Sequence, residues 1–163
     1  MAARGAPKNP KSCHERALGL LAVRARSRWE LERRLLQAGF DRVEVDEVLD
    51  RLERVGLVDD ATFAREFAEH GFGVRRSGRR AVSSALLSKG VAPSIVADIV
   101  AIGAPDEAER AEELACTRVS RMGSLEPAKA YARLVSLLLR RGYEPDVARQ
   151  AARRALQVAP EGF

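Results

Sequence analysis

The residues with the clearest chemical potential are arginines around two predicted helix starts. Three of them flank Ser27, namely Arg24, Arg26 and Arg28, and four surround Ser77-Gly78, namely Arg75, Arg76, Arg79 and Arg80. A helix N-terminus exposes backbone N–H groups that attract anions, and guanidinium groups bind phosphate and carboxylate through paired hydrogen bonds. The sequence therefore predicts that both clusters bind DNA or an acidic partner. The alternative is that they are solvated loops in an arginine-rich chain.

Each cluster also has local features of a helix start. Ser27 and Glu30 have the spacing of a capping box, in which each side chain accepts a bond from the other residue's backbone. Arginines in a first helical turn oppose the helix dipole by roughly 0.3–1 kcal/mol each. That cost favours binding of a negative group at the second cluster.

Residues suited to catalysis or to metal binding are sparse. His14 and His70 are far apart, and neither has a second ligand at metal-binding spacing. The Gly71–Gly73 segment lacks the third glycine and the preceding strand of a dinucleotide-binding loop. Asp59 and Asp60 are explained by helix capping. We therefore expect no enzyme activity, no metal site and no cofactor.

Other arginines and the larger aromatic residues have simpler explanations. Arg140 and Arg141 precede a predicted helix end, where the helix dipole favours a cation. Trp29 and Tyr131 have rings on which nucleic-acid bases can stack, but we favour positions at the edge of the core for both.

The overall composition limits the class of protein. The net charge is +5, from 24 arginines and four lysines against 23 acidic residues, which permits a nucleic-acid partner without requiring one. Because no apolar run approaches about 20 residues and the first residues are polar, we expect a cytoplasmic protein without a membrane segment. Cys13 and Cys116 have no CxxC spacing and are expected to be free thiols.

The elements that would position these residues are helices. Apolar residues recur at helical spacing from Cys13 almost to the end, and no segment alternates like a half-buried strand, so the predicted fold class is all-α. A Leu-Leu-x-x-Gly-apolar motif occurs three times, at residues 35–40, 86–91 and 138–143. Each copy predicts a helix end at which the glycine is left-handed and the last residue folds back on the helix.

This repetition predicts three tandem three-helix, helix-turn-helix-like modules in an elongated array. We expect a disordered tail at residues 1–12 and modules at 13–58, 59–104 and 105–160. New helices are expected at Arg42, Pro93 and Pro145, and Asp59 or Asp60 and Pro105-Asp106 are expected to open the second and third modules. Since the repeats bury one another's apolar faces, we expect a monomer.

Three stretches resemble the RecX family. They are Ser27 to Leu35 (SRWELERRL), the Ala38-Gly39-Phe40 turn, and Leu49 to Ala64 (LDRLERVGLVDDATFA). The likeness continues from Arg79 to Val91, and the third module shares the turn that ends at Tyr143. RecX proteins are tandem three-helix repeat proteins, so the resemblance agrees with the predicted repeats.

The resemblance implies a non-catalytic regulator in DNA repair, recombination and the SOS response. Its implied partners are the RecA recombinase filament and single-stranded DNA, the latter bound weakly or through the filament. The implied effect is inhibition of ATP hydrolysis, strand exchange and filament growth.

The alternative function is a stand-alone helix-turn-helix-like DNA-binding protein. The acidic residues at positions 41–54 oppose it, because DNA phosphates repel carboxylates. These acids are Asp41, Glu44, Asp46, Glu47, Asp50 and Glu53.

Overall fold

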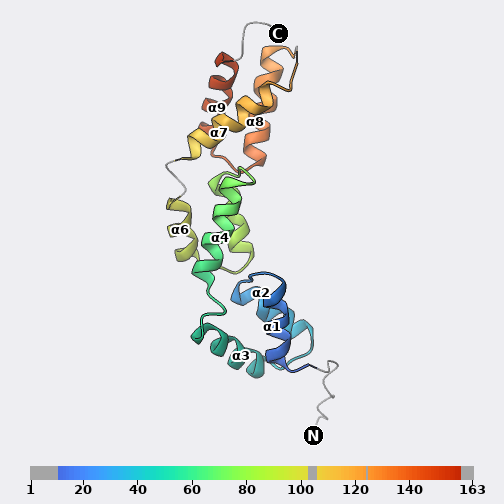
Figure 1. Ribbon diagram of the computed structural model, residues 1–163. Helices are drawn as coiled ribbons and strands as arrows, with labels where there is room; N and C mark the ends of the chain where they lie inside the picture. The colour runs from blue at the N-terminus through green and yellow to red at the C-terminus, as the bar shows by residue number, and fades with distance from the viewer. Residues whose placement is uncertain (1–10, 103–105, 124, 159–163) are drawn as a thin grey trace.

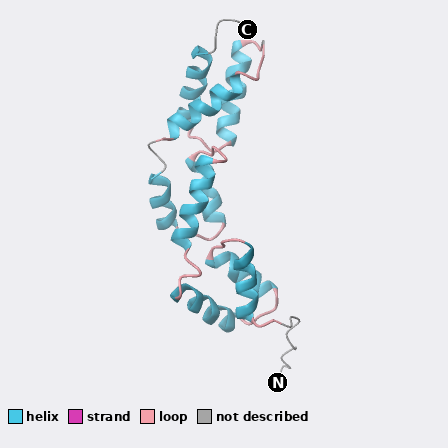
Figure 2. Cartoon of the chain, in the orientation of Figure 1, coloured by secondary structure: helices cyan, strands magenta, loops and turns pink. Residues whose placement is uncertain are grey.

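The computed structural model describes residues 11–102, 106–123 and 125–158, and all regular structure within these ranges is helical (Figure 2). The helices in chain order are α1 Cys13–Val23, α2 Arg28–Gln37, α3 Arg42–Arg54, α4 Asp60–Gly73, α5 Arg79–Ser88, α6 Pro93–Ile102, α7 Glu107–Val119, α8 Pro127–Arg140 and α9 Pro145–Val158. They form three successive groups of three, which lie one after another in an elongated array (Figure 1). The predicted all-α class and tandem helical repeats are therefore confirmed.

Each group of three helices encloses its own apolar core. Leu31, Leu35 and Leu49 are fully buried in the first core. The second core contains Phe63, Val82 and Leu86, and the third contains Leu134, Leu138 and Tyr143. Because each core is formed within one group, we refer to the groups as the first, second and third modules and keep the predicted ranges as our proposal for their boundaries.

The three repeated glycine turns end the second helix of each module as predicted. Gly39, Gly90 and Gly142 have φ values of 93°, 74° and 82°. The following residues fold back, because the N–H groups of Phe40, Val91 and Tyr143 donate to carbonyls five residues earlier at 3.3, 3.2 and 3.1 Å. This bond is typical of the Schellman motif, which satisfies carbonyl groups at a helix end.

The helix starts agree with the sequence in part. Helices α3, α6 and α9 begin at the predicted residues, Arg42, Pro93 and Pro145. Asp59 caps α4, accepting the N–H of Ala61 at 2.9 Å. Asp106 is the N-cap residue of α7, as predicted, but its side chain forms no cap bond, and Pro105 lies outside the described residues.

The expected disordered tail also needs a correction at its end. Residues 1–10 lie outside the described residues, but Ser12 forms a reciprocal capping box with Glu15. The Ser12 hydroxyl accepts the Glu15 N–H at 3.2 Å, and the Glu15 carboxylate accepts the Ser12 N–H at 2.8 Å. Since these bonds satisfy donors at the start of α1, Ser12 belongs to the first helix.

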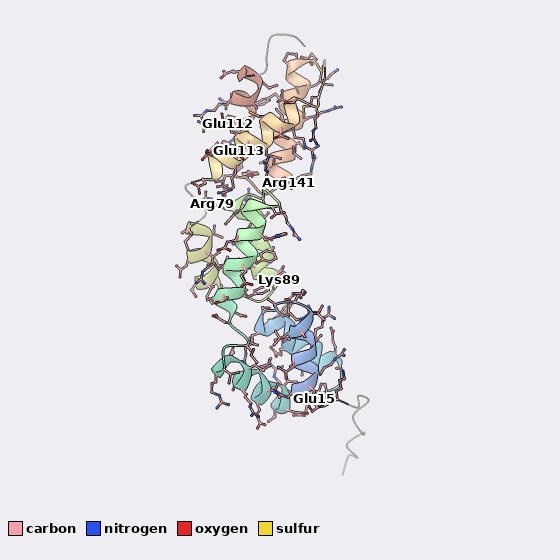
Figure 3. All side chains as sticks on the ribbon, viewed as in Figure 1. Glu15, Arg79, Lys89, Glu112, Glu113 and Arg141 are labelled. Atoms are coloured by element: carbon pink, nitrogen blue, oxygen red, sulfur yellow. The ribbon has the colours of Figure 1, made fainter. Side chains whose placement is uncertain are left out.

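Neighbouring modules meet where second helices lie end to end. At the first junction the start of α2 contacts the end of α5, and Lys89 lies between the two lower modules in Figure 3. The Ser27 hydroxyl donates to the Lys89 carbonyl at 2.5 Å, and a methyl group on Gly90 would overlap Trp29. The positive end of one helix dipole thus faces the negative end of the other, which is favourable.

The second junction repeats this arrangement with backbone groups. The start of α5 contacts the end of α8, near the labelled Arg79 and Arg141 in Figure 3. The Gly78 N–H donates to the Arg141 carbonyl at 2.8 Å, and the Arg80 N–H donates to the Gly142 carbonyl at 3.1 Å. A side chain at Gly78 would overlap the Gly142 backbone, so the close approach requires glycine there.

The two turns of the first and second modules allow a matched test of junction packing. Gly39→Ala should cost about 1–2 kcal/mol, because alanine is strained at positive φ and nothing lies within 4 Å of the new methyl group. Gly90→Ala should cost more, because its methyl group also displaces Trp29. Urea unfolding of both variants measures the difference, and equal losses would show that the Trp29–Gly90 contact adds no stability.

Candidate partner-binding surface

The predicted capping box at Ser27 is correct in one half only. The Ser27 hydroxyl accepts the Glu30 N–H at 3.2 Å, as predicted. The Glu30 carboxylate does not return to the Ser27 backbone and instead accepts hydrogen bonds from Arg24 and Lys89, each at 3.0 Å. Burial raises the pKa of Glu30, but the two cations lower it by more than burial raises it, so the pKa is about 2. The Glu30 side chain therefore contributes to the first junction and does not complete the capping box.

The other two arginines of the first cluster also have partners within the chain. Arg26 is only 8% exposed, and its Nε donates to the Leu20 carbonyl at 3.1 Å. Arg28 forms ion pairs with Asp50 at 2.8 Å and with Glu53 at 2.7 Å, which join α2 to α3. In this structure the first arginine cluster therefore stabilises the module and its junction.

Carboxylates of the following module occupy both predicted anion positions at helix starts. The Arg28 N–H, at the start of α2, donates to Asp60 at 2.8 Å. The Arg79 N–H, at the start of α5, donates to Glu107 at 2.9 Å, and the Arg79 side chain pairs with the same carboxylate. Glu107 is only 2% exposed, so the carboxylate of this pair is buried, while the Arg79 side chain is partly exposed. The negative group that the pattern predicted is thus supplied by the chain itself.

The side chains of Arg75, Arg76 and Arg80 are more accessible to a partner. Within the part of the chain that the structure describes, none of the three forms an ion pair with a carboxylate. Their loop is nevertheless held in place, because the Arg75 carbonyl accepts a bond from Arg141 at 2.5 Å and the Arg76 carbonyl accepts one from the Tyr143 hydroxyl at 2.8 Å. The third module therefore fixes the loop backbone, while Arg75 and Arg80 are exposed at the surface.

A shallow groove lies beside this loop, between the second module and Glu144 of the third. Its volume is about 400 Å³, and Arg79, Arg80, Leu87 and Val100 contribute to its lining. Arg80 thus places a cation beside apolar side chains of α5 and α6, an arrangement that suits contact with another protein.

A second groove, on the third module, contains arginines that were not selected from the sequence. Arg118 of α7 and Arg133 and Arg140 of α8 line a volume of about 600 Å³. The sequence feature that indicates this groove is the helical spacing of basic residues along α8, which is not visible as a run of consecutive arginines. Arg140 is also accounted for by its position at a helix end, so its sequence position alone does not indicate a groove.

The aromatic residues are packed, and the two cysteines are free thiols. Trp29 is 37% exposed and packs against Gly90. The Arg33 guanidinium lies over the Trp29 ring, with its Cζ atom 4.6 Å from the ring centroid. Tyr131 is partly buried against the third core. Cys13 is buried, which raises its pKa to about 11, and Cys116 is half-buried.

Within the described residues there is neither a metal-binding cluster nor a membrane-spanning helix. No group of three or more side chains there is arranged to hold a metal ion. No helix in the described ranges has both the length and the apolar character needed to cross a membrane.

These features define the class of protein as a tandem array of three-helix modules with exposed basic surfaces. Sequence models of the RecX first, second and third three-helix domains match residues 13–52, 59–99 and 105–152. The chain therefore belongs to the RecX family.

Comparison with individual proteins agrees with this assignment. The chain is 38% identical over 147 residues to the regulatory protein RecX of Mycobacterium sp. (strain JLS), covering 87% of this chain and 80% of the relative. It is 33% identical over 139 residues to that of Amycolatopsis mediterranei (strain U-32), covering 85% and 79%. The crystal structure of RecX from Lactobacillus salivarius superposes with a TM-score of 0.80 at 18% identity, covering 90% of this chain and 96% of that one. The first two likenesses indicate a regulatory protein, and the third shows a common fold.

The depressed pKa of Glu30 predicts a pH dependence of stability. A carboxylate whose pKa is lower in the folded state contributes stability above its unfolded pKa of 4.5, and this contribution is lost as the pH falls toward 2. Glu30→Gln should therefore be less stable than the parent protein at pH 6, and the difference should shrink between pH 5 and pH 2. Urea unfolding across this range measures it, and a difference independent of pH would contradict the role of the charge.

Proposed function

We propose that this protein binds the RecA recombinase filament on single-stranded DNA and inhibits its ATP hydrolysis, strand exchange and growth. Membership of the RecX family supports the proposal. The structural observation that carries it is the elongated array, whose junctions repeat the same end-to-end contact of second helices (Figure 1). A helical filament presents its subunits at regular intervals, so an elongated repeat protein can contact several of them at once.

We place the main recombinase contact on Arg75, Arg76 and Arg80. These side chains form no ion pair with a described carboxylate, and the third module holds their loop in place. A held loop loses little conformational freedom on binding, which favours affinity. Arg79, Arg24, Arg26 and Arg28 have partners within the chain, and we assign them to positioning the surface.

The proposal also includes the location, oligomeric state and cellular process of the protein. We infer that it acts as a monomer in the cytoplasm, without enzyme activity or a cofactor, in DNA repair, recombination and the SOS response. The stand-alone DNA reader is the weaker hypothesis, because α3 exposes acidic residues such as Glu44 and Glu47 that phosphates repel.

The first test measures ATP hydrolysis by RecA on single-stranded DNA. The parent protein should inhibit hydrolysis at less than one molecule per recombinase subunit. The variant Arg75→Ala/Arg76→Ala/Arg80→Ala should need about tenfold more protein, which corresponds to about 0.5 kcal/mol for each exposed ion pair.

The matched control for this test is Arg51→Ala/Arg65→Ala/Arg153→Ala, which removes three exposed arginines elsewhere and changes the net charge equally. It should inhibit like the parent protein. An equal loss in both variants would reject the proposed contact, and no inhibition by the parent protein at an equimolar ratio would reject the proposed function.

A further inference from the structure

The groove on the third module is positively charged without neutralising carboxylates. It lies between the end of α7 and the side of α8, and its volume is about 600 Å³. Its lining includes Arg118, Arg133 and Arg140 but no aspartate or glutamate. The groove therefore attracts a negatively charged ligand rather than a cation.

The basic side chains on α8 form a regular stripe. Lys129, Arg133, Ser136 and Arg140 are spaced by four, three and four positions, which places them on one face of the helix. The three cations of this stripe are exposed, and α8 from Pro127 to Arg140 contains no acidic residue. At 1.5 Å per residue, the stripe extends about 17 Å along the helix axis.

These arginines differ from the arginines at the module junctions in their partners. Arg28 and Arg79 are neutralised by carboxylates within the chain. Within the described residues, Arg118 and Arg133 form no ion pair, and Arg140 donates to the Ser136 hydroxyl at 2.8 Å, which leaves its charge uncompensated. Like charges gathered on one surface repel one another, and a bound anion removes that repulsion.

We propose that this groove binds the backbone of single-stranded DNA directly. Along a DNA strand the phosphates follow one another every few ångströms, so a basic stripe of about 17 Å meets several of them. The groove also contains Met122 and Leu137, whose apolar surface suits sugars and unpaired bases. In a duplex the bases are stacked inside and cannot reach this surface, so the groove favours a single strand.

The inference deepens the proposed function, in which DNA is one partner, but it can be tested without the recombinase. The probe is a labelled oligo(dT), and its binding to the full-length protein is followed by fluorescence anisotropy at increasing salt concentrations. For a single strand, the slope of log affinity against log salt changes by about 0.7 for each phosphate contact. The variant Arg133→Ala/Arg140→Ala should therefore bind more weakly, with a slope reduced by about 1.4.

The matched control is Arg149→Ala/Arg153→Ala on α9 of the same module, which changes the net charge equally. It should keep the slope of the parent protein, and far-UV circular dichroism should show unchanged helix content in both variants. An unchanged slope in the groove variant, or an equal reduction in the control, would overturn the proposed site.

Two competition experiments test the kind of ligand. Duplex DNA and polyglutamate should each displace the oligo(dT) less well than unlabelled oligo(dT) does. Equal displacement by the duplex would reject the preference for a single strand, and equal displacement by polyglutamate would reject a nucleic-acid site. If the groove variant loses DNA binding while the parent protein fails to inhibit RecA, the DNA site stands and the proposed regulation does not.

Discussion

The end-to-end contact between second helices is the interaction on which the array depends. Each contact places the N-terminus of α2 or α5 against the glycine turn that ends the next second helix. The first backbone N–H of each helix then donates to a carboxylate of the following module, which is Asp60 at the first junction and Glu107 at the second. The start of each of these helices is therefore completed only when the next module is folded beside it.

The two junctions achieve this contact with different groups. At the first, side chains predominate, because Glu30 binds both Arg24 and Lys89 and Trp29 packs on Gly90. At the second, backbone groups of α5 bind the turn after α8, and the ion pair of Arg79 with the buried Glu107 adds the charged component. Partly exposed ion pairs are screened by salt more than backbone bonds are, so the first junction is the more sensitive to ionic conditions.

Apart from Arg26, which is buried and bound to the Leu20 carbonyl, the arginines discussed above fall into two sets. One set pairs with carboxylates of the chain, within a module as Arg28 does or between modules as Arg79 does. The other set has no carboxylate partner within the described residues and lies on exposed surfaces, as Arg75 and Arg133 do. Density of arginines in the sequence does not distinguish the sets, because the partner of each guanidinium comes from another helix or another module.

The sequence by itself determined the helices and their repetition. The spacing of apolar residues, the Leu-Leu-x-x-Gly turns and the prolines at Pro93 and Pro145 act within one or two helical turns, so they can be recognised without a structure. Only the tertiary structure decided which charges remain available to a partner. Glu107 lies 28 positions from Arg79 and Lys89 lies 59 positions from Glu30. Such pairings depend on how folded modules dock, so no local pattern in the sequence predicts them.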